Sequence, residues 1–353
     1  MTRRLRRGAT VAGGLALLAV LTSCASNAPQ DSLKPAGPAA RDIDHLFKPV
    51  FLAATVVFFL VQFAVLLIVI RFRGRASDTD DGPEQFPSQL HGNTKLEIGW
   101  TILPVVILAV VAGFTLPVIF KLNRTPKNAL QVNVQGQKYW WAYSYPADQT
   151  DFGISSKIVT ANELHIPAGR PVFLHLTSTD VIHSWWAPRL NGKKDVVPGR
   201  VQTWTIEADH PGVYAGQCAE FCGTSHANMR IKVVADDEAT WNKWVAQMST
   251  PPTKPTTGLA AEGFQLFQQK GCSGCHQVDG QYQQVSSSSP SAPNLTHLFT
   301  RDCFAGCIYD LTDRNEVEAW LRNPQRKPGS LMKIGPLTED EIDRLYAYLR
   351  TLE

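Results

Sequence analysis

A short segment near the middle of the chain concentrates side chains that bind soft metal ions. It contains Cys218, Cys222, His226 and Met229 within twelve residues. Thiolate, imidazole and thioether donors together suit copper, and one His and one Cys with a weak axial Met are typical of an electron-transfer copper site. The second thiolate would allow two copper ions to be bridged, which requires a second imidazole. His183, which lies 35 residues before Cys218 at the end of an expected strand, can supply it.

Three alternatives to a paired copper site remain open at this level. A disulfide between Cys218 and Cys222 suits an exported protein, but it leaves His226 and Met229 without a role. A zinc ion prefers Cys, His and carboxylate ligands, so Met229 would be a poor partner for it. A single copper ion with one spare thiol is the third alternative. We favour the paired site because it uses all of the donors.

A second motif lies near the C-terminus. Cys272, Cys275 and His276 form a Cys-x-x-Cys-His sequence, which is the attachment motif for c-type haem. The two thiols reach the two vinyl groups, and the adjacent His binds the iron. A thioredoxin-like redox pair is the alternative, but no βαβ pattern surrounds the motif. Met/His ligation gives cytochromes c a high potential, and Met332, 56 residues after His276, is the expected sixth ligand.

The length and composition of the chain limit the classes of protein to which it can belong. The 353 residues suggest two to three domains. Only 18% of them are charged, below the usual ~25%, which suggests that part of the chain lies in lipid. The formal net charge is +3, and loss of an N-terminal leader with four arginines would leave −1. This balance argues against a nucleic-acid partner.

The N-terminal third predicts a leader and a membrane anchor. Residues 1–23 have the layout of a signal peptide, and the small residues before Cys24 resemble a bacterial lipobox, which would make Cys24 the lipidated N-terminus. Within 24–125, the apolar segments 50–70 and 98–120 are each long enough to span the ~30 Å hydrocarbon core. Arginines directly after the first span place the 71–96 loop in the cytoplasm. The remainder of the chain is then extracytoplasmic.

Two soluble domains are expected after the anchor. Short alternating runs with Pro and Gly between them predict an antiparallel sandwich or barrel over 126–249. The proline-rich segment 250–257 is a semi-rigid linker. Residues 258–353 predict a small all-α domain whose last helix begins with a capping box at Thr338 and Glu341. Within this domain Cys303 and Cys307 form either a local disulfide or two free thiols.

The copper motif, the upstream His-Ser-Trp and the runs at 97–104 and 195–200 resemble subunit II of the haem–copper cytochrome c oxidases over about residues 40–248. Residues 258–353 resemble a small cytochrome c. Together they resemble subunit II of the bacterial caa-type oxidases, which implies a transmembrane hairpin, a β-sandwich (cupredoxin) domain and an all-α cytochrome c domain. The family commonly has a Trp that receives electrons at the place of Tyr139, so docking of a soluble cytochrome c is in doubt.

The resemblance also implies the cofactors and their ligands. The dinuclear copper centre CuA would be held by His183, Cys218, the backbone carbonyl of Glu220, Cys222, His226 and Met229. The Glu220 side chain would reach a magnesium ion shared with subunit I. Cys272 and Cys275 would carry the covalent haem c, with His276 and Met332 as axial ligands and His297 left structural. Glu97 would lie at the entry of a proton path.

The implied function is that of an electron-input subunit in the bacterial cell membrane. Haem c would receive electrons from a quinol–cytochrome c reductase or another donor, and CuA would pass them to haem a of subunit I. Oxygen would be reduced to water there, coupled to proton pumping, in a complex that includes subunit III. A CuA-containing nitric oxide reductase and a free-standing membrane-tethered electron carrier are the alternatives.

Overall fold

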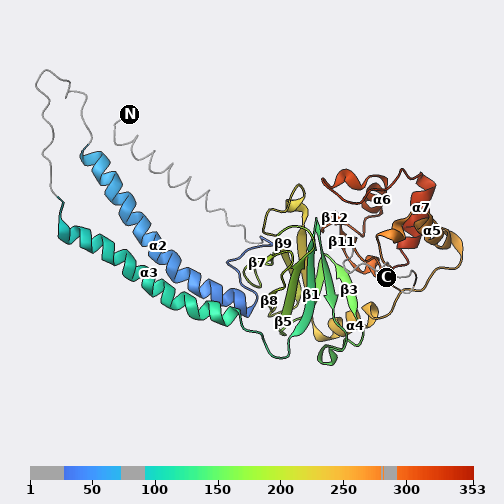
Figure 1. The fold of residues 1–353 in the computed structure, drawn as a ribbon, viewed down its shortest axis with the longest axis horizontal. Coiled ribbons are helices and arrows are strands. Elements are labelled where there is room, and N and C mark those ends of the chain that lie inside the picture. Colours follow the sequence, from blue (N-terminus) through green and yellow to red (C-terminus); the bar gives the residue numbers. More distant parts are fainter. Residues whose placement is uncertain (1–27, 73–91, 280, 282–291) are drawn as a thin grey trace, which may run out of the picture.

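The computed structural model describes residues 28–72, 92–279, 281 and 292–353. The expected signal peptide, the lipidation site Cys24 and most of the expected cytoplasmic loop lie outside these residues. Along the described chain, two long helices lead into a β-sandwich, and a helical domain follows (Figure 1). The helical domain lies on the side of the sandwich away from the two long helices.

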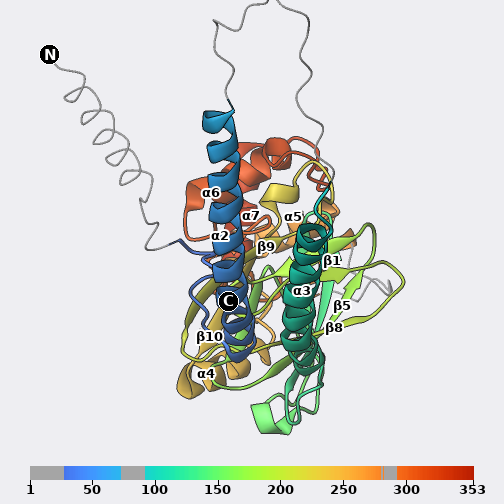
Figure 2. The same cartoon turned by 90° about the vertical axis from the view of Figure 1, so that its left-hand side faces the viewer.

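The two long helices are α2 (Pro38–Arg71) and α3 (Thr94–Leu122). They run side by side in both views (Figure 1, Figure 2). Each contains one of the apolar segments found in the sequence, and the most apolar part of each is fully exposed in the chain by itself. Such surfaces need a lipid environment. The 34 residues of α2 extend about 51 Å at 1.5 Å per residue, so the helix is longer than the hydrocarbon core.

The first turn of α2 attaches the hairpin to the sandwich. The Ala36 N–H donates to the Arg189 carbonyl over 2.7 Å, and Arg41 forms an ion pair with Asp209. At Gly37 a Cβ would lie 2.0 Å from the Glu207 carbonyl oxygen, so only glycine permits this approach. These contacts fix the direction in which the membrane hairpin leaves the soluble part.

Two five-stranded sheets form the sandwich. The first has the order β3-β2-β1-β5-β8 and the second the order β4-β10-β9-β6-β7. The bounds are β1 (Leu130–Gln137), β2 (Trp140–Tyr145), β3 (Ile158–Ala161), β4 (Glu163–Pro167), β5 (Val172–Ser178), β6 (His183–Trp186), β7 (Lys194–Val196), β8 (Gln202–Ile206), β9 (Gly212–Cys218) and β10 (Arg230–Asp236). Alternate residues of β1 face the core, where Trp141, Tyr143 and Trp185 are fully buried.

The sequence pattern predicted an antiparallel sandwich, but the structure also contains parallel strand pairs. Strand β1 runs parallel to β5, and β10 runs parallel to β4. The reason is topological: the strands between β1 and β5 include β4, which belongs to the other sheet. The chain therefore returns to the first sheet in the direction in which it left. Helix α4 (Glu238–Met248) covers one end of the core through Trp241 and Trp244.

The C-terminal domain is built on helices α5 (Gly258–Gln269), α6 (Arg314–Arg322) and α7 (Glu339–Leu349). Phe264 and Phe267 of α5 pack edge-on against Tyr348 of α7, with ring centroids 5.5 and 5.4 Å apart. The predicted capping box at Thr338 and Glu341 is present at the start of α7. A short hairpin with two residues in each strand, β11 (Cys303–Phe304) and β12 (Tyr309–Asp310), was not predicted. Cys303 and Cys307 form a disulfide at this hairpin.

Candidate metal and haem sites

Neighbouring strands of the second sheet bring the predicted copper ligands together. His183 begins β6 and Cys218 ends β9, and the two strands pair with Trp185 opposite Cys218. The loop after β9 is closed by two backbone hydrogen bonds. The Cys218 N–H donates to the Met229 carbonyl and the Ala219 N–H donates to the Ser184 carbonyl, both over 2.9 Å. The sheet therefore fixes both ends of the loop that carries the other donors.

The donor atoms form one compact cluster. The Sγ atoms of Cys218 and Cys222 are 3.9 Å apart. His183 Nδ1 lies 3.8 Å from the Cys218 sulfur, and His226 Nδ1 lies 3.7 Å from the Cys222 sulfur. Met229 Sδ is 4.0 Å from the Cys222 sulfur. The carbonyl oxygen of Glu220 is 3.3 Å from the Cys218 sulfur. The sulfur separation is about twice a disulfide bond length, so these thiols are separate and leave room for bridging ions.

The two thiols share one hydrogen bond, and their pKa values move in opposite directions. This bond lowers the pKa of Cys218 to about 3 and raises that of Cys222. The shared hydrogen bond therefore favours a metal-free pair with Cys218 as the thiolate and Cys222 as the thiol. Because metal ions bind the thiolate form, loading of the pair would release the remaining proton.

Asp180 is a residue that the sequence reading missed. One of its carboxylate oxygens lies 2.8 Å from His183 Nε2, and the carboxylate also accepts from the backbone N–H groups of Lys138 and Val181. A proton on Nε2 is then donated to Asp180, which leaves the Nδ1 lone pair facing the sulfur atoms. Burial opposes ionisation of Asp180, but its bond to His183 and these backbone donors lower its pKa to about 2. An acid three residues before a ligand His was the available signal.

The haem motif follows α5 directly. Gly271, with φ of +73°, ends the helix and starts the 3-10 turn Cys272–Gly274. Cys272 is half-buried and Cys275 is exposed. His276 Nδ1 lies 2.8 Å from the Pro293 carbonyl oxygen, to which it can only donate. Its Nε2 then carries a free lone pair, as a metal-binding imidazole requires.

Other residues of the C-terminal domain complete the picture. Met332 lies in the loop before α7, and Trp320 Nε1 donates to its sulfur over 3.2 Å. His297 is buried, and its Nδ1 bonds to the Glu353 carbonyl at 3.0 Å, which ties down the C-terminus. Arg301 is buried too; it donates to the Asn294 carbonyl, but its Nε has no partner among the described residues. A carboxylate of a bound haem could accept from this buried N–H group.

The remaining predicted site residues are exposed. The Glu220 side chain is exposed beside Phe221, of which 77% is exposed. Glu97 lies in the first turn of α3, where the side chain of Asn93 already caps the helix by accepting from the N–H groups of Lys95 and Leu96. The structure therefore brings the copper donors together and leaves Glu97 and Glu220 facing outward.

Comparison with known proteins assigns a family to each part of the chain. Residues 130–236 match the family model for the periplasmic domain of cytochrome c oxidase subunit II, residues 27–118 match that for its transmembrane domain, and residues 260–353 match cytochrome c. The solved periplasmic domain of subunit II of cytochrome oxidase from Bradyrhizobium japonicum is 28% identical and covers 36% of this chain and 97% of that one, with a TM-score of 0.33.

Two curated relatives match almost from end to end. Cytochrome c oxidase subunit 2 of Alkalihalophilus pseudofirmus is 35% identical over 94% of both chains. That of Bacillus subtilis is 31% identical over 96% of both. Because the matches cover the anchor, the sandwich and the cytochrome c domain together, the chain belongs to the family of cytochrome c oxidase subunit II, in a form that ends in a cytochrome c domain.

Proposed function

We propose that this chain accepts electrons at haem c, transfers them to a dinuclear CuA centre and delivers them to a partner subunit that reduces oxygen. Family membership makes it the electron-input subunit of an oxidase, anchored in a membrane with a periplasmic domain. The observation that carries the proposed path is the cluster of His183, Cys218, Cys222, His226 and Met229, which the second sheet and the loop after β9 bring together.

Each member of the cluster has a defined task. Cys218 and Cys222 would supply the two thiolates that hold a pair of copper ions, and His183 and His226 would supply the imidazoles. Met229 and the carbonyl oxygen of Glu220 would be weaker ligands, one near the sulfur of Cys222 and the other near that of Cys218. Bound copper would supply a carrier for one electron at a time. The buried surroundings of Cys218 and Cys222 exclude water, which limits the structural change that accompanies a change of charge.

In the C-terminal domain, the proposed haem ligands come from two segments. Cys272 and Cys275 form the thioether bonds, and His276 and Met332 bind the iron. A bound haem would supply the entry carrier for single electrons. Arg301 is buried and offers its Nε, which has no hydrogen-bond partner among the described residues, to a haem carboxylate.

The outward-facing residues suit contacts with other subunits and with lipid. We assign Glu220 to a magnesium ion shared with subunit I, because its side chain is exposed beside the copper loop. We place the helix pair in the bacterial cell membrane in contact with subunits I and III, and we take a quinol–cytochrome c reductase or a similar complex as the electron donor.

A substitution of Cys222 tests the copper assignment. In Cys222→Ser one thiolate cannot bridge two ions, so the mixed-valence signal of the two-copper centre should disappear from the EPR spectrum. Membranes should keep haem c but lose the oxidation of added reductant by oxygen, because the copper centre that passes the electrons on no longer forms. Ala227→Ser adds the same hydroxyl to an exposed position of the same loop and is the matched control. A seven-line hyperfine pattern with full activity in Cys222→Ser would refute the assignment.

A second substitution tests Glu97 as the entry of a proton path. Because Asn93 already caps α3, Glu97→Gln should leave assembly and electron transfer from CuA to subunit I unchanged. Reduction of the oxygen site should slow, because the protons that compensate its charge arrive late. Stopped-flow reduction of the assembled complex measures this rate. An unchanged rate would leave Glu97 with only a favourable interaction with the helix dipole.

A further inference from the structure

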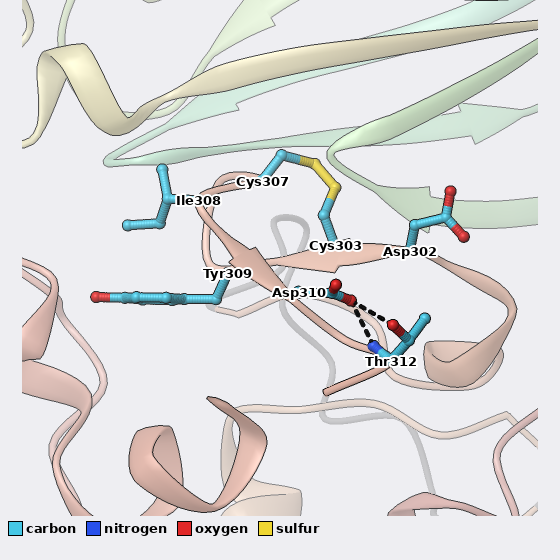
Figure 3. Close-up of a pocket in the computed structure, with 7 residues that line it drawn as sticks. All are labelled: Asp302, Cys303, Cys307, Ile308, Tyr309, Asp310 and Thr312. Atoms are coloured by element: carbon cyan, nitrogen blue, oxygen red, sulfur yellow. Dashed lines mark hydrogen bonds between the residues drawn. A yellow bond between two sulfur atoms is a disulfide. The ribbon is translucent and has the colours of Figure 1, made fainter. Parts of the chain in front are cut away.

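One of the segments through which the C-terminal domain contacts the sandwich is a small loop, residues 302–307, here called the docking loop. The disulfide between Cys303 and Cys307 closes it, with the two Cα atoms 4.7 Å apart. Figure 3 shows this disulfide on the side of the β11–β12 hairpin that lies nearer the strands of the sandwich. The loop is therefore a covalently closed projection of one domain toward the other.

A buried acid of the sandwich receives the docking loop. Glu163 at the start of β4 is 2% exposed, and its Oε1 accepts from the backbone N–H groups of Asp302 over 2.8 Å and Cys303 over 3.1 Å. Lys232 of β10 pairs with both Glu163 and Asp302. The buried carboxylate thus obtains both of its backbone donors from the other domain, which is a specific contact rather than a loose one.

Backbone contacts continue toward the copper loop. The Arg230 N–H donates to the Gly306 carbonyl over 3.2 Å. At Gly306, with φ of +82°, a Cβ would lie 2.3 Å from the Asn228 carbonyl oxygen and 3.0 Å from that of Tyr139. The docking loop therefore meets the sandwich backbone to backbone, with no room for a side chain at this position.

A lysine of the C-terminal domain also binds this face of the sandwich. Lys327 is buried, and its Nζ donates to the carbonyl oxygens of Tyr139 and Ala305, each over 2.8 Å. Next to it, the hydroxyl of Ser225 in the copper loop donates to the Pro328 carbonyl. Tyr139 is consequently only 8% exposed. The turn beside the metal cluster is covered by the chain's own C-terminal domain.

We propose that the docking loop holds the tethered cytochrome c domain on this face of the sandwich and thereby keeps an external redox protein away from the metal cluster. The docking itself rests on the contacts above, and the exclusion of an external carrier rests on the proposed function. The tether raises the local concentration of the domain, and the buried Glu163 contact selects one orientation.

Two variants break the contact from opposite sides. Gly306→Ala places a methyl group against the Asn228 carbonyl, and Glu163→Gln removes the charge that the docking loop faces without altering the hairpin or its disulfide. Gly258→Ala is the matched control, because Gly258 also has a positive φ, of +70°, but a Cβ there would meet nothing within 4 Å. All three are made in the full chain in detergent, and α7 provides an internal reference for the fold of the domain.

The rate of amide hydrogen exchange at the interface reports whether the C-terminal domain is docked, and it can be measured with or without bound cofactors. We expect the amides of Arg230, Asp302 and Cys303 to exchange about tenfold faster or more in Gly306→Ala and Glu163→Gln, with α7 unchanged and Gly258→Ala like the wild type. Wild-type exchange in both variants would overturn the proposal. Faster exchange throughout α7 in Gly306→Ala alone would mean that the hairpin had unfolded, and Glu163→Gln then decides.

The second measurement tests whether the docked domain keeps an external electron carrier away from the copper site. Reduced soluble cytochrome c is mixed with the copper-loaded chain, and the second-order rate of copper reduction is followed. We expect this rate to rise about tenfold or more in both variants, because the covered face becomes accessible. An unchanged rate despite faster amide exchange would refute the exclusion while leaving the docking intact. A chain that binds no copper would refute the proposed function, and the exchange result would still stand.

Discussion

The two predicted redox sites of this chain are built in different ways. Cys218, Cys222 and Met229 are members of the sandwich's own hydrophobic core, and sheet hydrogen bonds fix the loop that carries them. In the C-terminal domain, Cys272 packs only at the edge of the core, and Met332 lies in a loop outside it. The copper donors are thus part of the packed core of their domain, whereas the haem ligands lie at the edge of theirs or outside it.

The largest expected effect concerns removal of each cofactor. In the double variant Cys272→Ala and Cys275→Ala, which cannot attach haem, residues 258–353 should lose most of their protection from amide exchange. Chelation of copper from the wild type should affect only the loop 218–229, because the core around it remains complete. Exchange measured by mass spectrometry on the full chain compares the two. If the haem-free domain kept its protection from exchange, the proposed difference between the two cofactor sites would be wrong.

The next effect concerns the haem ligand that lies outside the core. Met332→His should keep the covalent haem, because both thioether bonds remain, but lower its potential by on the order of 0.1 V, within the ~0.8 V that axial ligands span. Loss of the thioether removes the ligand that raises the potential. Potentiometric titration measures the shift, and Met248→Leu in α4 is the control. If a sulfur-to-iron charge-transfer band survives in Met332→His, the ligand lies elsewhere.

A smaller effect should follow from loosening the copper site. Asp180→Asn keeps one oxygen, which can still accept from the Val181 N–H, but an NH2 group replaces the oxygen that accepts from the Lys138 N–H, and the charge that orients His183 is lost. Removal of such a supporting residue typically costs ~10- to 100-fold in metal affinity. Competition with a copper chelator measures the affinity, and Asp151→Asn, at an exposed position, is the control. Equal affinities in the two variants would mean that core packing alone orients His183.

The smallest effect concerns a helix cap in the haem domain. Thr338→Ala removes the hydroxyl that accepts from the Glu341 N–H and should cost about 1 kcal/mol of stability in that domain. Denaturant unfolding followed by haem absorbance should report the loss, while the copper spectrum should keep its wild-type midpoint. A shift of both midpoints by the same amount would show that the domains unfold as one unit.

Much of the fold could be predicted because its signals are local. The two apolar segments have the length of a membrane span, and the alternating runs from residue 130 onward have the period of strands. The capping box at Thr338 was readable for the same reason. The parallel pairing of β1 with β5 was not readable, because it depends on where residues 42 positions apart, such as Leu130 and Val172, come together.

The sequence by itself determined the chemistry of the two sites, because the donor atoms are fixed by residue type and most of them lie within a few positions of one another. The Cys-x-x-Cys-His motif and the loop from Cys218 to Met229 are of this kind. Only the tertiary structure decided that Asp180 orients His183, that the buried Nε of Arg301 has no hydrogen-bond partner among the described residues, and that Lys327 reaches the carbonyl of Tyr139, 188 residues away. Such contacts arise from the packing of strands and domains, which no local spacing encodes.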